Sequence, residues 1–124
     1  MPGTIWGAHG EYISSPHLDD VQCAYASVKA LLEGGHRDSI SVCSVFDNEE
    51  VGSGTKQGAA SGFLKDTLTR IADSLGKDAE DFRRMLAESF MISADNAHAA
   101  HPNHMDKADP TNRPYMNEGI VIKY

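Results

Sequence analysis

An abrupt change of composition at Phe46 restricts the fold of this chain more than any other stretch. Residues 39–46 (SISVCSVF) are rich in β-branched and apolar side chains, which favours a strand. Four polar residues, 47–50 (DNEE), follow at once and lead to Gly52 and Gly54, so the strand cannot continue. The acids are therefore predicted to lie on a loop at its carboxyl end. In open α/β sheets that edge is where ligands bind.

The adjacent Glu49 and Glu50 of this loop suit a hydrolytic metal site. One carboxylate can ligate a cation while its neighbour takes a proton from the bound water. A run of charges is also typical of a solvated turn, and these residues alone do not decide between the two interpretations.

Length and charge exclude several classes of protein. A chain of 124 residues is enough for one domain with a modest core, and its net charge of -7 argues against nucleic acid and anionic membranes as partners. No apolar run is long enough to span a bilayer, and the first residues lack the pattern of a signal peptide. Cys23 and Cys43 are expected to be buried free thiols in a reducing cytosol, with a disulfide as the alternative.

Apolar periodicity predicts three helices. Apolar residues recur at steps of three and four from Leu18 to Leu32, after Ser15 and Pro16 and before two glycines. The same spacing covers residues 64–75, and a third helix follows Asp78 as its N-cap and reaches Phe90.

The remaining segments are expected to be extended or irregular. Residues 4–14 are predicted to be extended, and 89–94 and 119–124 are predicted strands. The long connection 95–118 shows no periodicity and is rich in His, Asn, Asp and Pro, which is typical of a functional or mobile loop.

Several candidate ligands fall at the ends of these elements. Asp19 and Asp20 lie in or just before the first turn of a helix, where the helix dipole alone explains a carboxylate. Asp95 directly follows a predicted strand, and the loop after it carries His98, His101 and His104, which polar surface also explains. Together with Glu49 and Glu50, Asp19, Asp95 and the histidines offer the carboxylates and imidazoles that a two-zinc hydrolase requires.

Four strings carry a resemblance to a known family. SPHLDD, FDNEEVGS, SADNAHAAHPN and GIVIKY, in this order and at these separations, resemble the M18 metallopeptidases, the aspartyl aminopeptidase family. The similarity runs from about Tyr12 to Tyr124. It implies a zinc-exopeptidase fold of the phosphorylase/hydrolase-like type, a mixed sheet flanked by helices, with residues 1–124 as part of the catalytic domain. It also implies a cytosolic enzyme that forms homo-oligomers, a dodecamer in the family.

The resemblance implies metal-binding and catalytic roles for individual residues. Asp19 matches the aspartate that bridges two zinc ions, Glu50 matches the zinc ligand next to the general base, and Asp95 matches a ligand of the other zinc. Glu49 matches the general base itself. Asp20 stands where the family is variable and receives no role.

The resemblance also implies residues that bind the substrate. His98 and His101 match histidines close to the active site, and His101 is the better candidate for stabilising the oxyanion. Lys123 matches a lysine that can pair with an acidic side chain, and HAAHPN favours Asp or Glu at the substrate's N-terminus. The implied reaction is attack of a zinc-bridging water on the scissile carbonyl of a peptide.

One departure from the family pattern limits this expectation. Two zinc-ligand histidines of the family have no counterpart here: the His-x-Asp string expected upstream is absent, and the second histidine falls beyond Tyr124. We therefore expect an excised middle piece of the catalytic domain or a truncated gene product, with weak or absent metal binding and negligible turnover. The alternatives are a non-catalytic interaction or assembly module and a structural site for a single ion.

Overall fold

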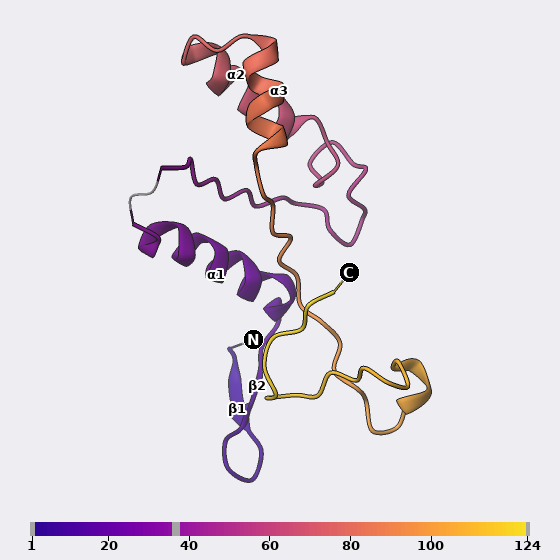
Figure 1. Ribbon diagram of the computed structural model, residues 1–124. Helices are drawn as coiled ribbons and strands as arrows, with labels where there is room; N and C mark the ends of the chain where they lie inside the picture. Colours follow the sequence, from indigo (N-terminus) through magenta and orange to yellow (C-terminus); the bar gives the residue numbers. More distant parts are fainter. Residues whose placement is uncertain (1, 36–37, 124) are drawn as a thin grey trace. The chain divides into compact units, whose positions relative to one another are not determined.

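The computed structural model describes residues 2–35 and 38–123, which fall into two compact units (Figure 1). One unit combines Met1–Leu32 with Ala94–Tyr124, and the other consists of Glu33–Ser93. Asp19 and Asp95 belong to the first unit, whereas Glu49 and Glu50 belong to the second.

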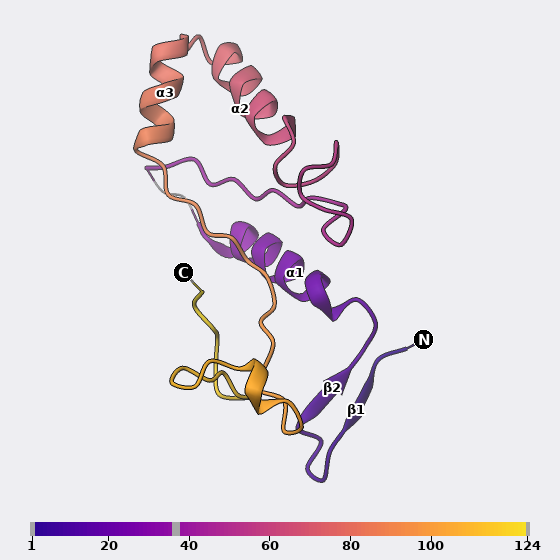
Figure 2. The ribbon, with the colours of Figure 1, turned by 90° about the vertical axis from the view of Figure 1, so that its right-hand side faces the viewer.

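The first unit begins with a β-hairpin (Figure 2). Strands β1 (Thr4–Trp6) and β2 (Tyr12–Ser14) pair antiparallel, with Ile5 opposite Ile13. The rings of Trp6 and Tyr12 face each other across the ladder with centroids 5.0 Å apart, an aromatic cross-strand pair of the kind that stabilises hairpins. The predicted extended segment is therefore a two-stranded sheet.

Helix α1 (Leu18–Glu33) confirms the first predicted helix. Its start is irregular: His17 has a φ of 60°, Asp19 has non-helical angles, and the peptide bond between Asp19 and Asp20 is cis. The helix ends before Gly35, whose φ of 68° suits a glycine. The carboxylates of Asp19 and Asp20 therefore project from a helix start that departs from regular helical geometry.

The second unit contains the other two predicted helices, α2 (Phe63–Ser74) and α3 (Ala79–Ala87). Asp78 caps α3 as expected, because its Oδ1 accepts hydrogen bonds from the backbone N–H of Glu80 and Asp81 at 2.8 and 2.9 Å. The Asp81 carboxylate accepts in return from the Asp78 backbone N–H, which completes a capping box. The prediction that α3 reaches Phe90 is wrong, since the helix stops three residues earlier and Phe90 is 89% exposed.

The acidic loop of the second unit is held by its own hydrogen bonds. The Asn48 side chain donates to Oε1 of Gln57 at 3.1 Å, and the Asp47 backbone N–H donates to the Gln57 carbonyl at 3.2 Å. The ring of Phe46 meets that of Phe63 edge to face, with centroids 6.3 Å apart. These contacts fix the residues on either side of Glu49 and Glu50.

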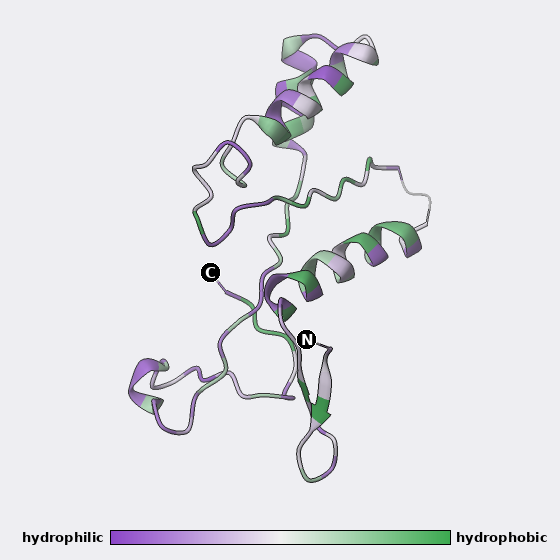
Figure 3. Cartoon of the chain, turned by 180° about the vertical axis from the view of Figure 1, so that it is seen from behind, coloured by the Kyte–Doolittle hydropathy of each residue, from purple (hydrophilic) through white to green (hydrophobic). Residues whose placement is uncertain are grey.

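Of the predicted mixed sheet, the described residues form one strand pairing, the hairpin. Residues 39–46, 89–94 and 119–123 carry no strand hydrogen bonds, and Tyr124 lies outside the described residues. A strand needs a neighbour for its backbone groups. Apolar side chains along these segments are exposed, among them Ile40 at 69% and Ile120 at 93%, and Figure 3 shows the hydrophobic stretches along the traces.

Regular structure in the part of the chain that the structure describes consists of short elements, few of which bury apolar side chains. Ala72 is the one buried apolar side chain among these residues. No helix there has the length and apolar character needed to cross a membrane.

The capping box predicts a pH dependence of α3. The N–H groups of Asp81 and Glu80 lower the pKa of Asp78, so its contribution to helix stability is present above the ordinary aspartate pKa and is lost as the pH falls through the lowered value. We expect the helical Cα chemical shifts at the start of α3 to decrease over that range in NMR spectra. Asp78→Asn keeps a capping side chain without a titrating group, so its spectra should not show this change.

Candidate metal centre

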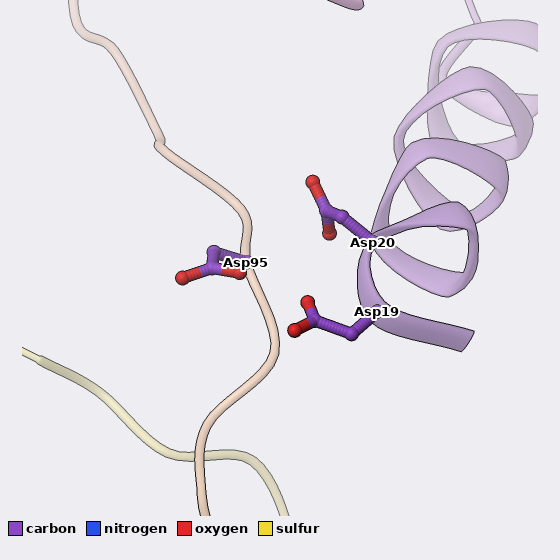
Figure 4. A group of neighbouring side chains, drawn as sticks. All are labelled: Asp19, Asp20 and Asp95. Carbon is purple, nitrogen blue, oxygen red and sulfur yellow. The ribbon is translucent and has the colours of Figure 1, made fainter. Parts of the chain in front are cut away.

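Three aspartates from two distant segments meet in the first unit. Asp19 and Asp20 project from the start of α1, and Asp95 lies on the segment that follows residue 93 (Figure 4). One carboxylate oxygen from each lies within 4.8 Å of the others. This carboxylate cluster confirms neither a ligand nor a role, but it brings two of the predicted ligands, Asp19 and Asp95, into one place.

Asn96 connects the two segments that carry the cluster. Its Nδ2 donates to the Leu18 carbonyl at 3.0 Å, and its Oδ1 accepts from the Cys23 thiol at 3.2 Å. Both hydrogen bonds are half-buried. They join Asn96 to Leu18, 78 residues earlier in the sequence, and to Cys23, 73 residues earlier. The start of α1 is therefore tied to the residue next to Asp95.

Lys123 supplies a positive charge to the cluster. Its ammonium donates to Oδ2 of Asp95 at 3.0 Å and to the Asn96 carbonyl at 3.3 Å. The hydrogen bond from Lys123 lowers the pKa of Asp95. Asp95 is therefore ionised at neutral pH and able to act as a ligand.

The pKa of the Cys23 thiol is raised, whereas that of Asp95 is lowered. Burial raises its pKa, and the carboxylate of Asp20 raises it further. The sulfur is accordingly protonated at neutral pH, which makes it the donor in its hydrogen bond with Asn96. Cys23 and Cys43 are both free thiols, as predicted, but they are half-buried and not fully buried.

The donor set of the cluster fits a divalent cation. Among the described residues, Oδ1 of Asp20 is a buried side-chain oxygen without a hydrogen-bond partner. A buried carboxylate oxygen in that state is costly unless a cation or a proton donor meets it. Zinc, calcium and magnesium all accept carboxylate oxygens as ligands. The cluster could therefore provide the oxygen ligands of a zinc site.

The histidine loop belongs to the same unit. Nδ1 of His101 accepts a hydrogen bond from the Asn103 backbone N–H at 3.1 Å, and the rings of His101 and His104 lie 5.2 Å apart. The Ala100 N–H donates to the Pro114 carbonyl at 2.7 Å and closes the loop. His98 is exposed and is not a member of the carboxylate cluster.

Glu49 and Glu50 occupy an exposed turn of the second unit. The structure therefore brings Asp19, Asp95 and Lys123 together. That Glu49 and Glu50 belong to the same metal site stays a prediction. Sequence reasoning gave Asp20 no role and did not single out Asn96. The available signal was their position, since each directly follows a predicted ligand.

Comparisons with known proteins agree with this donor chemistry. The family described as "Aminopeptidase I zinc metalloprotease (M18)" matches residues 1–124. The probable M18 family aminopeptidase 2 of Clostridium acetobutylicum is 54% identical over 121 residues, which cover 98% of this chain and 28% of that protein. The probable aspartyl aminopeptidase of Ricinus communis is 39% identical over 131 residues, which cover 100% of this chain and 27% of that protein.

A solved structure supports the same relationship. The chain matches the structure of Chaetomium thermophilum mApe1 with a TM-score of 0.81 and 33% sequence identity, over 94% of this chain and 28% of that one. The chain belongs to the M18 family of zinc metallopeptidases, and it resembles the aspartyl aminopeptidases among them. It spans about 28% of the length of the curated relatives cited first.

Replacing the ammonium beside Asp95 should change the titration of that residue. In Lys123→Gln the pKa of Asp95 is expected to rise toward the ordinary aspartate value, because the hydrogen bond that lowers it is weakened and its charge is lost. The ¹³C shift of the Asp95 carboxyl carbon measured against pH checks this. Lys107→Gln removes another lysine, one that pairs with Asp106 at 4.0 Å, and should leave the Asp95 titration unchanged.

Proposed function

We propose that this chain carries the carboxylate ligands and the general base of a two-zinc M18 aminopeptidase that removes N-terminal Asp or Glu from peptides. The observation that supports this most directly is the convergence of Asp19, Asp20 and Asp95 within 4.8 Å. Family membership supports the zinc chemistry. The acidic substrate preference rests on the resemblance of the HAAHPN segment and on Lys123.

Asp19, Glu50 and Asp95 are the residues that would hold the zinc ions, with Asp19 shared between them. When bound, zinc supplies a Lewis acid that polarises the scissile carbonyl and acidifies water. The unsatisfied Oδ1 of Asp20 provides a further acceptor beside Asp19. These residues are oxygen donors, and the family's histidine ligands complete the set.

Glu49 is the proposed general base. It takes a proton from the attacking water and passes it to the departing amine, which must leave protonated. Its turn lies between Asn48 and Gln57, whose side chains are hydrogen-bonded to each other, so the carboxylate is carried on a short, hydrogen-bonded loop.

His101 is the proposed hydrogen-bond donor to the developing oxyanion. Because Nδ1 accepts from the Asn103 N–H, the proton of the neutral ring is on Nε2. That nitrogen can therefore donate to a negatively charged oxygen in the tetrahedral intermediate.

Lys123 and His98 are the proposed contacts for the acidic side chain of the substrate. The Lys123 side chain is 55% exposed while it pairs with Asp95, so the ammonium can reach a second carboxylate. An ion pair of this kind gives a preference for Asp and Glu over neutral residues.

The apolar segments 39–46, 89–94 and 119–124 are proposed to become strands of a mixed sheet in the complete catalytic domain. Exposed side chains and a lack of strand partners in 39–46, 89–94 and 119–123 support this, since such edges pair readily with further strands. A cytosolic homo-oligomer is proposed on the family resemblance alone.

By itself the chain is proposed to bind divalent ions weakly and to turn over substrate negligibly. The cluster in the described residues contains carboxylates and no imidazole, and oxygen-only sites of modest charge bind in about the millimolar range. The second candidate function is therefore a non-catalytic or structural carboxylate site.

A chimera tests the enzyme function. Residues 1–124 would replace the matching segment of the Clostridium acetobutylicum relative, and zinc content and release of N-terminal Asp would be measured. Glu49→Gln should keep the zinc and lower kcat by about 10²–10⁴-fold, because only proton transfer is lost. Asp19→Asn and Asp95→Asn should lose zinc as well as activity.

Glu88→Gln provides the control, because this carboxylate lies at the end of α3 and has no proposed role. It should match the unmodified chimera in both measurements. A folded chimera that binds two zinc ions and is unaffected by Glu49→Gln would refute the role of Glu49. A folded chimera without zinc would favour the non-catalytic alternative.

A further inference from the structure

We propose that Asn96 is a positioning residue that holds Asp95 against Asp19 and Asp20 by bridging α1 with its side-chain amide. The bridge consists of its two hydrogen bonds, to the Leu18 carbonyl and from the Cys23 thiol. The inference rests on the proposed function, since a cation is the reason for bringing the carboxylates together.

The contacts of the amide enclose the acidic residues of the helix. Leu18 lies immediately before Asp19, and Cys23 lies one turn further along α1 than Asp20. Asn96 is in turn covalently next to Asp95. Fixing this one side chain therefore fixes the separation of carboxylates that come from segments more than 70 residues apart.

The bridge works against electrostatic repulsion without altering the charge of the site. The carboxylates of the cluster repel one another at separations of up to 4.8 Å. Lys123 lowers that repulsion by adding a positive charge next to Asp95. The amide of Asn96 is neutral, so it restrains the geometry and leaves the negative charge that attracts a cation.

The chemistry of the partners sets the orientation of the amide. The Leu18 carbonyl can only accept, so it faces Nδ2, and Oδ1 is left facing the Cys23 thiol. A flipped amide would place two oxygens together and would lose both bonds. Cys23 therefore acts as the donor that completes the bridge.

The test uses the 124-residue chain with Mn²⁺ as the probe, which broadens the NMR signals of nearby nuclei. In the unmodified chain millimolar Mn²⁺ should broaden the backbone signals of Asp19, Asp20 and Asp95 selectively. Asn96→Ala should weaken this binding about tenfold, as is typical when a residue that orients metal ligands is removed. The helical circular dichroism should be retained.

Asn117→Ala is the matched control. Asn117 also donates its Nδ2 to a distant backbone carbonyl, that of Glu11 at 3.1 Å, but it does not contact the cluster. It should leave the Mn²⁺ affinity unchanged, whereas a general effect of losing an amide hydrogen bond would lower affinity in both variants.

Variants of Cys23 test the bridge from its other end. Cys23→Ser retains a hydroxyl donor and should bind Mn²⁺ about as well as the unmodified chain, while Cys23→Val removes the donor and should weaken binding. Because both residues act through one bridge, the double variant Cys23→Val/Asn96→Ala should bind Mn²⁺ only slightly more weakly than Asn96→Ala alone.

The outcomes separate this inference from the proposed function. Equal Mn²⁺ affinity of the unmodified chain and Asn96→Ala would overturn the positioning role and leave the metal centre intact. If millimolar Mn²⁺ does not broaden these signals in the unmodified chain, the proposed metal centre is overturned and the positioning role with it. Selective broadening that Asn96→Ala weakens and Cys23→Ser preserves supports both.

Discussion

Holding like charges together is the central physical demand of this structure. One carboxylate oxygen each of Asp19, Asp20 and Asp95 lies within 4.8 Å of the others, although the residues come from segments more than 70 residues apart. Repulsion between ionised carboxylates would separate them unless other interactions compensate. Here a neutral amide restrains the backbone segments and an ammonium offsets part of the charge. The cluster consequently keeps enough negative charge to attract a cation.

The rest of the first unit supports this arrangement locally. The irregular start of α1 presents two carboxylates in succession, and the histidine loop is shaped by its own backbone hydrogen bonds. The hydrogen bond to Nδ1 of His101 fixes the ring's tautomer before any substrate is present. The roles proposed for Asp95 and His101 would both rely on a neighbouring residue that orients the side chain by a hydrogen bond.

The described residues bury little apolar surface. Ile40, Phe90 and Ile120 are largely exposed, and the described residues bury one apolar side chain, Ala72. Burial of apolar surface is the main source of folding free energy. This chain matches 28% and 27% of the length of the two M18 relatives described above.

Local sequence patterns determined the helices, the cap at Asp78 and the candidate ligands, because helix periodicity and capping depend on residues only a few positions apart. Family-specific strings added the zinc chemistry. The sequence could not determine strand pairing for residues 39–46, since a ladder requires a partner from elsewhere. Tertiary structure alone decided that Asn96 meets Leu18 and Cys23, because side-chain contacts over more than 70 residues follow from the folded path of the chain and not from local spacing.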